Sequence, residues 1–330
     1  MSRGRPRLLV IFAGVLVSLA ALLAVLGALL RGPPTWNVPQ RFDPRPVSAE
    51  RLEQTVRTLC GEFVPRSYLK PDNLERAATW IAEQFTDAGL KVGEQPFSSR
   101  EGRFRNILAR REGSDPARGL IIIGAHYDAF ADMPGADDNA SGVAALIELA
   151  RTLPERQPRR GQLFVAFANE EPPFFTTPDM GSYHLAKKLA EEQTDIELMI
   201  ALDLIGYFSD EPGSQRTLFW PLGLYYPSRG NFIGIVGDTR AGRWIRQVKR
   251  GMRSARSLPV LSFRAPRAIP GVDWSDHFWF RELDLPGVLV TDTAMMRTPH
   301  YHSNSDTPDT LDYQRLAAVV QALHGVLQDE

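Results

Sequence analysis

Histidine and carboxylate side chains stand at the ends of several apolar runs in this sequence. The segments that carry them read GAHYDAF, GADDNASG, FANEEPP, IALDLIG and HYHSNSDT. The apolar runs predict buried strands, and an open α/β sheet binds its ligands at the carboxyl ends of its strands. Imidazole nitrogens and carboxylate oxygens are the ligands of hydrolytic zinc sites. The pattern therefore indicates a metal site at one edge of a sheet. The candidate residues are His126, Asp138, Glu170, Glu171, Asp203 and His302.

Two adjacent carboxylates at the mouth of a predicted strand form the sharpest local signal. Glu170 and Glu171 follow the apolar run LFVAFA and precede Pro172–Pro173. Adjacent carboxylates repel each other unless a cation or a proton is bound. Neighbouring residues at a strand end also point in different directions. One glutamate can therefore bind a metal while the other acts as general base.

The remaining candidates are each weaker alone. Asp128 lies two residues after His126, where its carboxylate can hold the second ring nitrogen of the histidine. We therefore predict a supporting catalytic role for Asp128 rather than metal ligation. Asp203 interrupts an apolar run and needs either a metal or a basic side chain, because an unpaired buried charge is very costly. His300 and His302 both lie in the polar loop after the run GVLVT, and the residues alone do not choose between them.

Composition excludes several other classes of protein. The 330 residues are 43% apolar and 23% charged, which is typical of a globular protein and argues against extended disorder. The formal net charge of −1 indicates no basic face for nucleic acid. Cys60 is the only cysteine, so the chain can form no internal disulfide and no cysteine-based zinc site.

The N-terminal region predicts a membrane anchor. Residues 8–30 form an uncharged apolar run of 23 residues, preceded by Arg3, Arg5 and Arg7. About 20 apolar residues suffice for a helix to cross a bilayer, and flanking arginines stay on the cytoplasmic side. We predict a cytoplasmic tail (1–7), a signal anchor (8–30), a Pro/Arg-rich spacer (31–46) and an extracytoplasmic catalytic domain (47–330), in the bacterial periplasm or at the cell exterior. A cleaved signal peptide is the alternative, and it also exports the domain.

The rest of the chain alternates between helical and strand patterns. Alternation of this kind predicts a single α/β domain whose central mixed, mostly parallel sheet is flanked by helices. We expect helices at 47–60, 73–89, 141–153, 182–192, 240–254 and 311–327. We expect strands at 91–97, 104–110, 119–126, 162–168, 198–204, 232–237, 260–264 and 287–291. The run LIIIGAH is too apolar for an edge strand and predicts a position inside the sheet.

These motifs, over roughly residues 50–328, resemble the co-catalytic dizinc exopeptidases, the family of the secreted bacterial zinc aminopeptidases. The resemblance implies two Zn²⁺ ions bridged by Asp138 and a water or hydroxide. By that similarity His126 and Asp203 would complete one zinc site, and Glu171 and His302 the other. It selects His302 over His300, because Ser305-Asp306-Thr307 follows as in the family. It also makes Glu170 the general base and suggests a cis Asp138–Asn139 peptide.

The function implied is that of an aminopeptidase, which would act on peptides with a free N-terminus. The segment PPFFTTPDMGS departs from the short Gly-rich turn of simple aminopeptidases and is expected to reshape the substrate pocket. Asp276 and His277 are expected to form the pocket or support the ligands. The alternatives are a glutaminyl-peptide cyclase, a carboxypeptidase or dipeptidase of the same superfamily, and a non-catalytic receptor-like ectodomain. The preferred substrate and the oligomeric state stay open.

Overall fold

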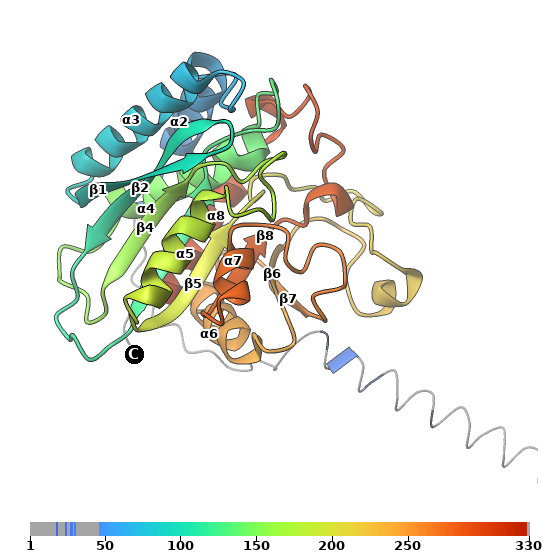
Figure 1. Cartoon of the computed structure of the whole chain (residues 1–330). Helices are drawn as coiled ribbons and strands as arrows, with labels where there is room; N and C mark the ends of the chain where they lie inside the picture. The colour runs from blue at the N-terminus through green and yellow to red at the C-terminus, as the bar shows by residue number, and fades with distance from the viewer. Residues whose placement is uncertain (1–17, 19–23, 25–26, 29, 31–45, 329–330) are drawn as a thin grey trace, which may run out of the picture.

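A mixed sheet of eight strands runs through the computed structural model (Figure 1). The structure describes residues 46–328 together with residues 18, 24, 27, 28 and 30. The strands are β1 (Lys91–Ser99), β2 (Gly102–Arg111), β3 (Leu120–His126), β4 (Gln162–Phe167), β5 (Ile196–Leu202), β6 (Ile233–Gly237), β7 (Val260–Arg264) and β8 (Val288–Thr291). Their order across the sheet is β1-β2-β4-β3-β5-β8-β6-β7.

The centre of the sheet is parallel. Strand β3 pairs in parallel with both β4 and β5, and the pairs β5–β8 and β6–β7 are also parallel. The pairs β1–β2, β2–β4 and β6–β8 are antiparallel. Every residue of β3 and β4 is buried, as expected for apolar strands that are covered on both faces. The predicted mixed sheet is therefore confirmed, with three antiparallel pairs beside four parallel ones.

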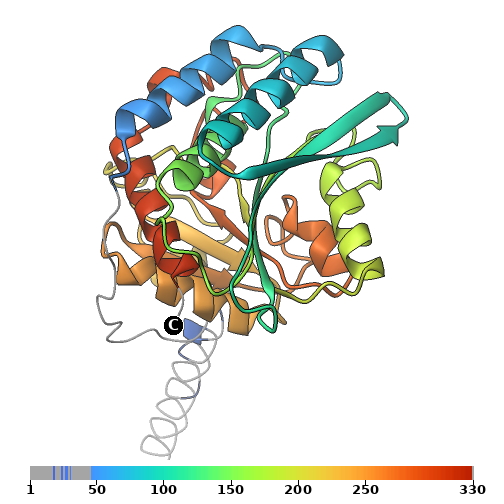
Figure 2. The same cartoon turned by 90° about the vertical axis from the view of Figure 1, so that its left-hand side faces the viewer.

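Helices cover both faces of the sheet (Figure 2). They are α2 (Ala49–Glu62), α3 (Pro71–Asp87), α4 (Gly142–Arg151), α5 (Gly181–Glu191), α6 (Gly242–Ser254), α7 (His277–Glu282) and α8 (Tyr313–Leu327). Helices α2, α3, α4, α6 and α8 share the larger apolar core, whereas α5 and α7 pack against the opposite face. Shorter helical turns lie at η1 (Ala136–Ser141), η2 (Trp220–Leu224), η3 (Ala294–Met296) and η4 (Pro308–Thr310).

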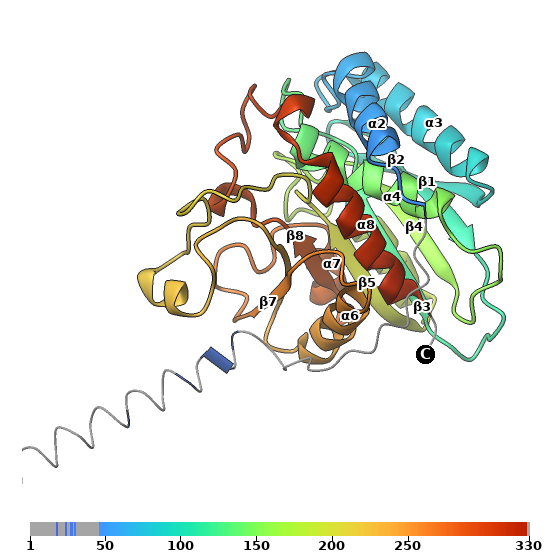
Figure 3. The same ribbon diagram turned by 180° about the vertical axis from the view of Figure 1, so that it is seen from behind.

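Every predicted helix and strand is present within a few residues of its expected bounds. Helix α7 was not predicted, because a six-residue helix is too short to establish an apolar period. The sequence pattern also predicts no helix or strand for the segment between β5 and β6. That segment contains η2 and projects from the molecule beside β7 (Figures 1 and 3).

The predicted membrane span, residues 8–30, lies mostly outside the described residues. The predicted tail (1–7) and all but the last residue of the predicted spacer (31–46) also lie outside them. In the part of the chain that the structure describes, no helix has the length and apolarity needed to cross a membrane. The anchor stays a prediction.

Candidate metal centre

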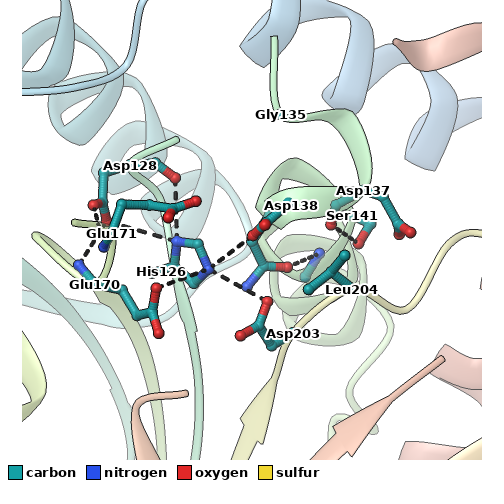
Figure 4. Close-up of polar contacts among 12 residues, drawn as sticks. His126, Asp128, Gly135, Asp137, Asp138, Ser141, Glu170, Glu171, Asp203 and Leu204 are labelled. Carbon is teal, nitrogen blue, oxygen red and sulfur yellow. Dashed lines mark hydrogen bonds and ion pairs between the residues drawn. The ribbon is translucent and has the colours of Figure 1, made fainter. Parts of the chain in front are cut away.

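Three neighbouring parallel strands deliver most of the candidate residues to one place. His126 is the last residue of β3, and Asp203 follows directly after β5. Glu170 and Glu171 lie in the turn after β4. Because β4, β3 and β5 are adjacent and parallel, their carboxyl ends meet at one edge of the sheet. Figure 4 shows these side chains converging there.

Asp138 lies in the kinked turn η1, between β3 and α4, and contacts two histidines. Its Oδ1 is 3.3 Å from Nε2 of His126, and its Oδ2 is 3.2 Å from Nε2 of His302. The kink comes from non-helical backbone angles at Asp138 and Asn139, and the peptide bond between them is cis, as the resemblance suggested. Each carboxylate oxygen thus faces a different imidazole.

Each histidine also contacts a second carboxylate. Oδ1 of Asp203 lies 3.3 Å from Nε2 of His126. Oε2 of Glu171 lies 3.2 Å from Nε2 of His302. The five residues therefore form two groups of three that share Asp138, one around each histidine.

The donor atoms fit zinc. One ligand atom each of His126, Asp138 and Glu171 lie within 4.8 Å of one another in a buried site. Oε1 of Glu171 is buried and makes no hydrogen bond to the described residues, although a buried carboxylate oxygen normally has a partner. Imidazole nitrogen with carboxylate oxygen is the donor set of hydrolytic zinc sites. A cation would complete the coordination that the protein leaves open.

Glu170 turns away from its neighbour toward the first histidine. Its Oε2 is 3.8 Å from Nε2 of His126, and the side chain is buried at the wall of a pocket. Burial, with repulsion from Asp203 and Glu171, raises the pKa of Glu170 well above its ordinary value. A carboxylate with high proton affinity beside a reaction site is suited to take up a proton.

The pKa values of the other side chains in the site are also shifted by burial and by their charged neighbours. Burial opposes ionisation of Asp138, but the two histidines in contact with it lower its pKa below the ordinary range. Burial and repulsion from Asp138 raise the pKa of Glu171 to about 8. Burial disfavours a charged His302, yet its contacts with Asp138 and Glu171 raise its pKa to about 10. The site therefore keeps Asp138 ionised, whereas Glu171 and His302 both have a raised affinity for a proton.

Asp128 supports the site mainly through the main chain. Its two carboxylate oxygens accept hydrogen bonds from the backbone N–H groups of Glu170 (3.1 Å) and Glu171 (3.0 Å). Nδ1 of His126 lies closer to the carbonyl oxygen of Asp128 (3.2 Å) than to its carboxylate (3.6 Å). Asp128 thus orients His126 with its backbone and the glutamate turn with its side chain.

Asp306 holds the turn that carries Asp138, as Asp128 holds the turn that carries the two glutamates. The carboxylate of Asp306 accepts hydrogen bonds from the backbone N–H groups of Asp137 (2.8 Å) and Asp138 (3.1 Å). In the sequence, Asp306 stands out only as part of the segment Ser305-Asp306-Thr307 that marks His302. Its separation from Asp138 by 168 positions along the chain gave no signal of this contact.

Arg66 is a second residue that sequence reasoning missed. Its buried guanidinium donates to four backbone carbonyl oxygens, at 2.8 to 3.1 Å. Three of these, from Tyr127, Pro134 and Gly135, belong to the loop between His126 and Asp138. Because charged donors make strong hydrogen bonds, Arg66 holds the loop that separates two candidate ligands.

The structure separates His300 and His302, the two candidates for the last metal ligand. Nδ1 of His300 contacts Oγ of Ser305 at 2.8 Å, away from the carboxylates. His302 instead stacks between Phe130 (ring centroids 4.3 Å apart) and Tyr301 (3.9 Å). Asp276 and His277, which were expected to form the pocket or support the ligands, are not among the residues that line the pocket, and His277 contacts the carbonyl oxygen of Val272 at 2.8 Å.

A pocket of about 410 Å³ opens from the candidate metal centre. Asp138, Glu170, Glu171, Asp203 and His302 line one end. Apolar side chains such as Phe232, Val236 and Leu289 line much of the rest. The segment PPFFTTPDMGS, which differs from the family pattern, contributes Pro172 and Phe175 to the pocket wall. Residues of the 215–226 segment form another wall. The pocket thus joins a charged end to a largely apolar interior.

Comparison with known proteins identifies the family. The model of peptidase family M28 matches residues 106–327, which is most of the chain. The chain belongs to peptidase family M28. This confirms the resemblance to dizinc exopeptidases, and the chain is a metallopeptidase of the zinc type.

Proteins of similar sequence or fold include an uncharacterised protein, an aminopeptidase and a glutaminyl cyclase. This M28 peptidase is 44% identical over 289 residues to the uncharacterised protein YfbL of Escherichia coli, covering 85% of this chain and 88% of YfbL. Its fold is similar to that of the LapA aminopeptidase of Legionella pneumophila, with a TM-score of 0.66, 20% identity, and coverage of 85% of this chain and 71% of LapA. It is also similar to the glutaminyl cyclase of Fimbriiglobus ruber, with a TM-score of 0.68, 21% identity, and coverage of 87% and 98%.

Proposed function

We propose that this M28 peptidase is a zinc-dependent aminopeptidase that removes N-terminal residues from peptides. The observation that carries the proposal is the position of Asp138, with one carboxylate oxygen toward His126 and the other toward His302. A shared carboxylate between two complete three-residue groups supports two zinc ions. His126, Asp138 and Asp203 would hold one ion, and Asp138, Glu171 and His302 the other.

The chemistry divides between the ions and the side chains. Zinc bound there would supply positive charge that polarises the scissile carbonyl and favours ionisation of water. Glu170, buried beside His126, takes the proton of the attacking water and delivers it to the leaving amine. Asp128 keeps Glu170 in position, since it accepts the backbone N–H of that residue.

The charges of the pocket favour a substrate with a free amino group over one with a free carboxylate. The acidic side chains at its charged end would be neutralised by the two zinc ions, which leaves no net positive charge there to bind a substrate carboxylate. Arg216 is the one lysine or arginine among the described residues that line the pocket, and its guanidinium donates to the carbonyl oxygen of Met295. A carboxypeptidase needs a cation directed at the substrate carboxylate, whereas this arginine is directed at the backbone.

A panel of substrates tests the reaction. We expect the full-length protein with zinc to hydrolyse leucyl-p-nitroanilide and to leave acetyl-leucyl-p-nitroanilide intact, because acetylation removes the ammonium group. Equal hydrolysis of both compounds would contradict the aminopeptidase assignment. Release of ammonia from a peptide with N-terminal glutamine, without cleavage of the anilide, would instead identify a glutaminyl cyclase. Metal analysis of the same sample should find about two zinc ions per chain, as expected for a shared-carboxylate site.

We also propose that residues 8–30 anchor the enzyme, with the catalytic domain outside the cytoplasm. The support is the uncharged run with three arginines before it. In intact spheroplasts, external protease should digest the catalytic domain, and the full-length protein should stay with the membrane after a carbonate wash. A soluble protein that resists external protease would contradict the anchor and its orientation.

A further inference from the structure

Exposed apolar side chains gather on one part of the surface. Among the described residues, six large apolar side chains are exposed, and all but Leu69 lie in the segment 218–224 or at position 274. We name these five the apolar rim. They are Leu218, Phe219, Trp220, Leu224 and Trp274. Trp220 is 79% exposed and Leu224 is 62% exposed, so their burial would need something outside the described residues.

The apolar rim borders one side of the pocket. Leu218 and Trp274 of the rim, and Leu222 between the other rim residues, line the pocket that ends at the candidate metal centre. The 3₁₀ turn η2 presents Trp220 and Leu224 outward while Leu222 is buried beneath them. The exposed apolar surface therefore lies at the entrance that a substrate would use.

The end of the apolar N-terminal run lies against the same segment. Leu30, the last residue of that run, is buried in a small apolar cluster with Leu222, Ala265 and Val272. Gly27 lies close against the ring of Tyr225, where a Cβ atom would come within 2.1 Å of the ring. In Figures 1 and 3 the described residues of the N-terminal run are on the side of the molecule that carries η2. A membrane entered by this run would therefore begin beside the rim.

The charge around the rim suits a lipid surface. No Asp or Glu occurs between residues 212 and 237, and that stretch contains Arg216 and Arg229, both exposed. Anionic headgroups attract such side chains by electrostatic interaction. Tryptophan is also enriched at the boundary between hydrocarbon and headgroups. Exposed tryptophan, leucine and arginine are the combination that this boundary favours. Two acidic side chains lie beside it, Asp210 near Arg229 and Asp273 next to Trp274, and they are paired with Arg315 and Arg267.

We propose that the apolar rim inserts into the surface of the membrane that residues 8–30 enter, so that the pocket opens at the lipid headgroups. This inference rests on the proposed anchor. Its occupant is a bilayer that contains anionic phospholipid. Peptides that partition to the membrane surface would then reach the candidate metal centre by moving along the bilayer.

Spin labels on the full-length protein test the insertion. In a Cys60→Ala background, Leu224→Cys and Leu69→Cys each carry one label in vesicles of phosphatidylcholine and phosphatidylglycerol. Neither position lines the pocket, so hydrolysis of the anilide reports that each variant is folded. Leu69 is a matched control, being an exposed leucine (52%) between α2 and α3. We expect the label at 224 to collide more with oxygen, which concentrates in lipid, and the label at 69 to collide more with a water-soluble nickel chelate.

A third label separates the rim from the anchor. A label at Ala20→Cys that favours oxygen, together with a label at 224 that behaves like the one at 69, would overturn the insertion and leave the anchor standing. A label at 20 that favours nickel would overturn the anchor and the insertion together. Protection of the label at 224 from both reagents, with dipolar broadening between labels, would overturn lipid insertion in favour of a second copy of the chain.

Discussion

One carboxylate joins the two halves of the candidate metal centre. Asp138 contacts His126 and His302 through different oxygens, at 3.3 and 3.2 Å. The two glutamates beside it face different histidines. Glu171 contacts His302, whereas Glu170 approaches His126 at the pocket wall. Two glutamates that are adjacent in sequence therefore have separate parts, and single substitutions distinguish them.

Glu170→Gln is expected to reduce kcat by about a hundred- to ten-thousand-fold while zinc content stays unchanged, because the amide keeps the shape of the side chain but accepts no proton. Glu171→Gln is expected to lose zinc, because it removes a charged ligand. Metal analysis and anilide kinetics on both variants measure the difference. Wild-type kcat in Glu170→Gln would contradict the general-base assignment.

Asp128→Asn is expected to weaken zinc binding by about 10–100-fold, the usual cost of losing a residue that orients a ligand. The amide offers one acceptor for two backbone N–H groups and turns its own NH₂ toward one of them. Competition with a chromogenic chelator measures the affinity. Asp179→Asn is the control and should bind zinc as the parent does, because Asp179 lies in the loop after β4 that carries the two glutamates but is paired with the exposed Arg100. Equal affinity in the two variants would show that Asp128 does not hold the turn.

At the scale of elements, the loop between β3 and η1 depends on a side chain from outside it. Arg66 precedes α3, yet its guanidinium donates to Tyr127, Pro134 and Gly135 across that loop. The ligands on both sides of the loop, His126 and Asp138, therefore keep their spacing through a contact that local sequence does not contain.

Arg66→Met is expected to lower the free energy of unfolding by roughly 3 kcal/mol, because buried carbonyl oxygens lose their donor. Urea denaturation with and without zinc measures it. Arg57→Met is the control, since the side chain of Arg57 is half exposed and its partners Glu53 and Asp309 are exposed. A loss of unfolding free energy in Arg66→Met no larger than in Arg57→Met would show that Arg66 does not hold this loop.

At the scale of the whole molecule, the metal centre is a concentration of buried negative charge. Bound zinc stabilises the folded chain by mass action, by about 4 kcal/mol at a thousandfold excess over Kd. Chelation is therefore expected to lower the Tm, and added zinc to restore it. Calorimetry in EDTA and after zinc addition measures the change. An unchanged Tm would show that the carboxylates are held without a cation.

The metal-free protein is further expected to lose stability as pH rises. The folded pKa of Glu171 is raised from 4.5 to about 8, so its protonated form favours folding below 4.5 and that contribution disappears by about pH 8. The pKa of His302 is raised from 6.5 to about 10, so its contribution disappears over that higher range. Urea titrations in EDTA across these ranges measure the slope. Stability that rises between pH 6.5 and about 8 would contradict it.

Much of the fold was predictable because its central strands are locally explicit. The runs LIIIGAH and QLFVAF are wholly buried strands, and their apolar composition indicates this without any partner. Helix α7 and turn η2 were not predictable in the same way. They are too short for a period, and their positions depend on packing against distant segments.

The sequence by itself determined the kind of chemistry, because residue type and position at a strand end are local properties. Histidines and acids after apolar runs indicated a zinc site, the resemblance carried by these motifs implied a peptidase, and the family match confirms that class. Only the tertiary structure decided which oxygen of Asp138 faces which histidine, and that Asp306 and Arg66 hold the turns. Those contacts join residues tens to hundreds of positions apart. The chain's path through the sheet creates them, and no local pattern records that path.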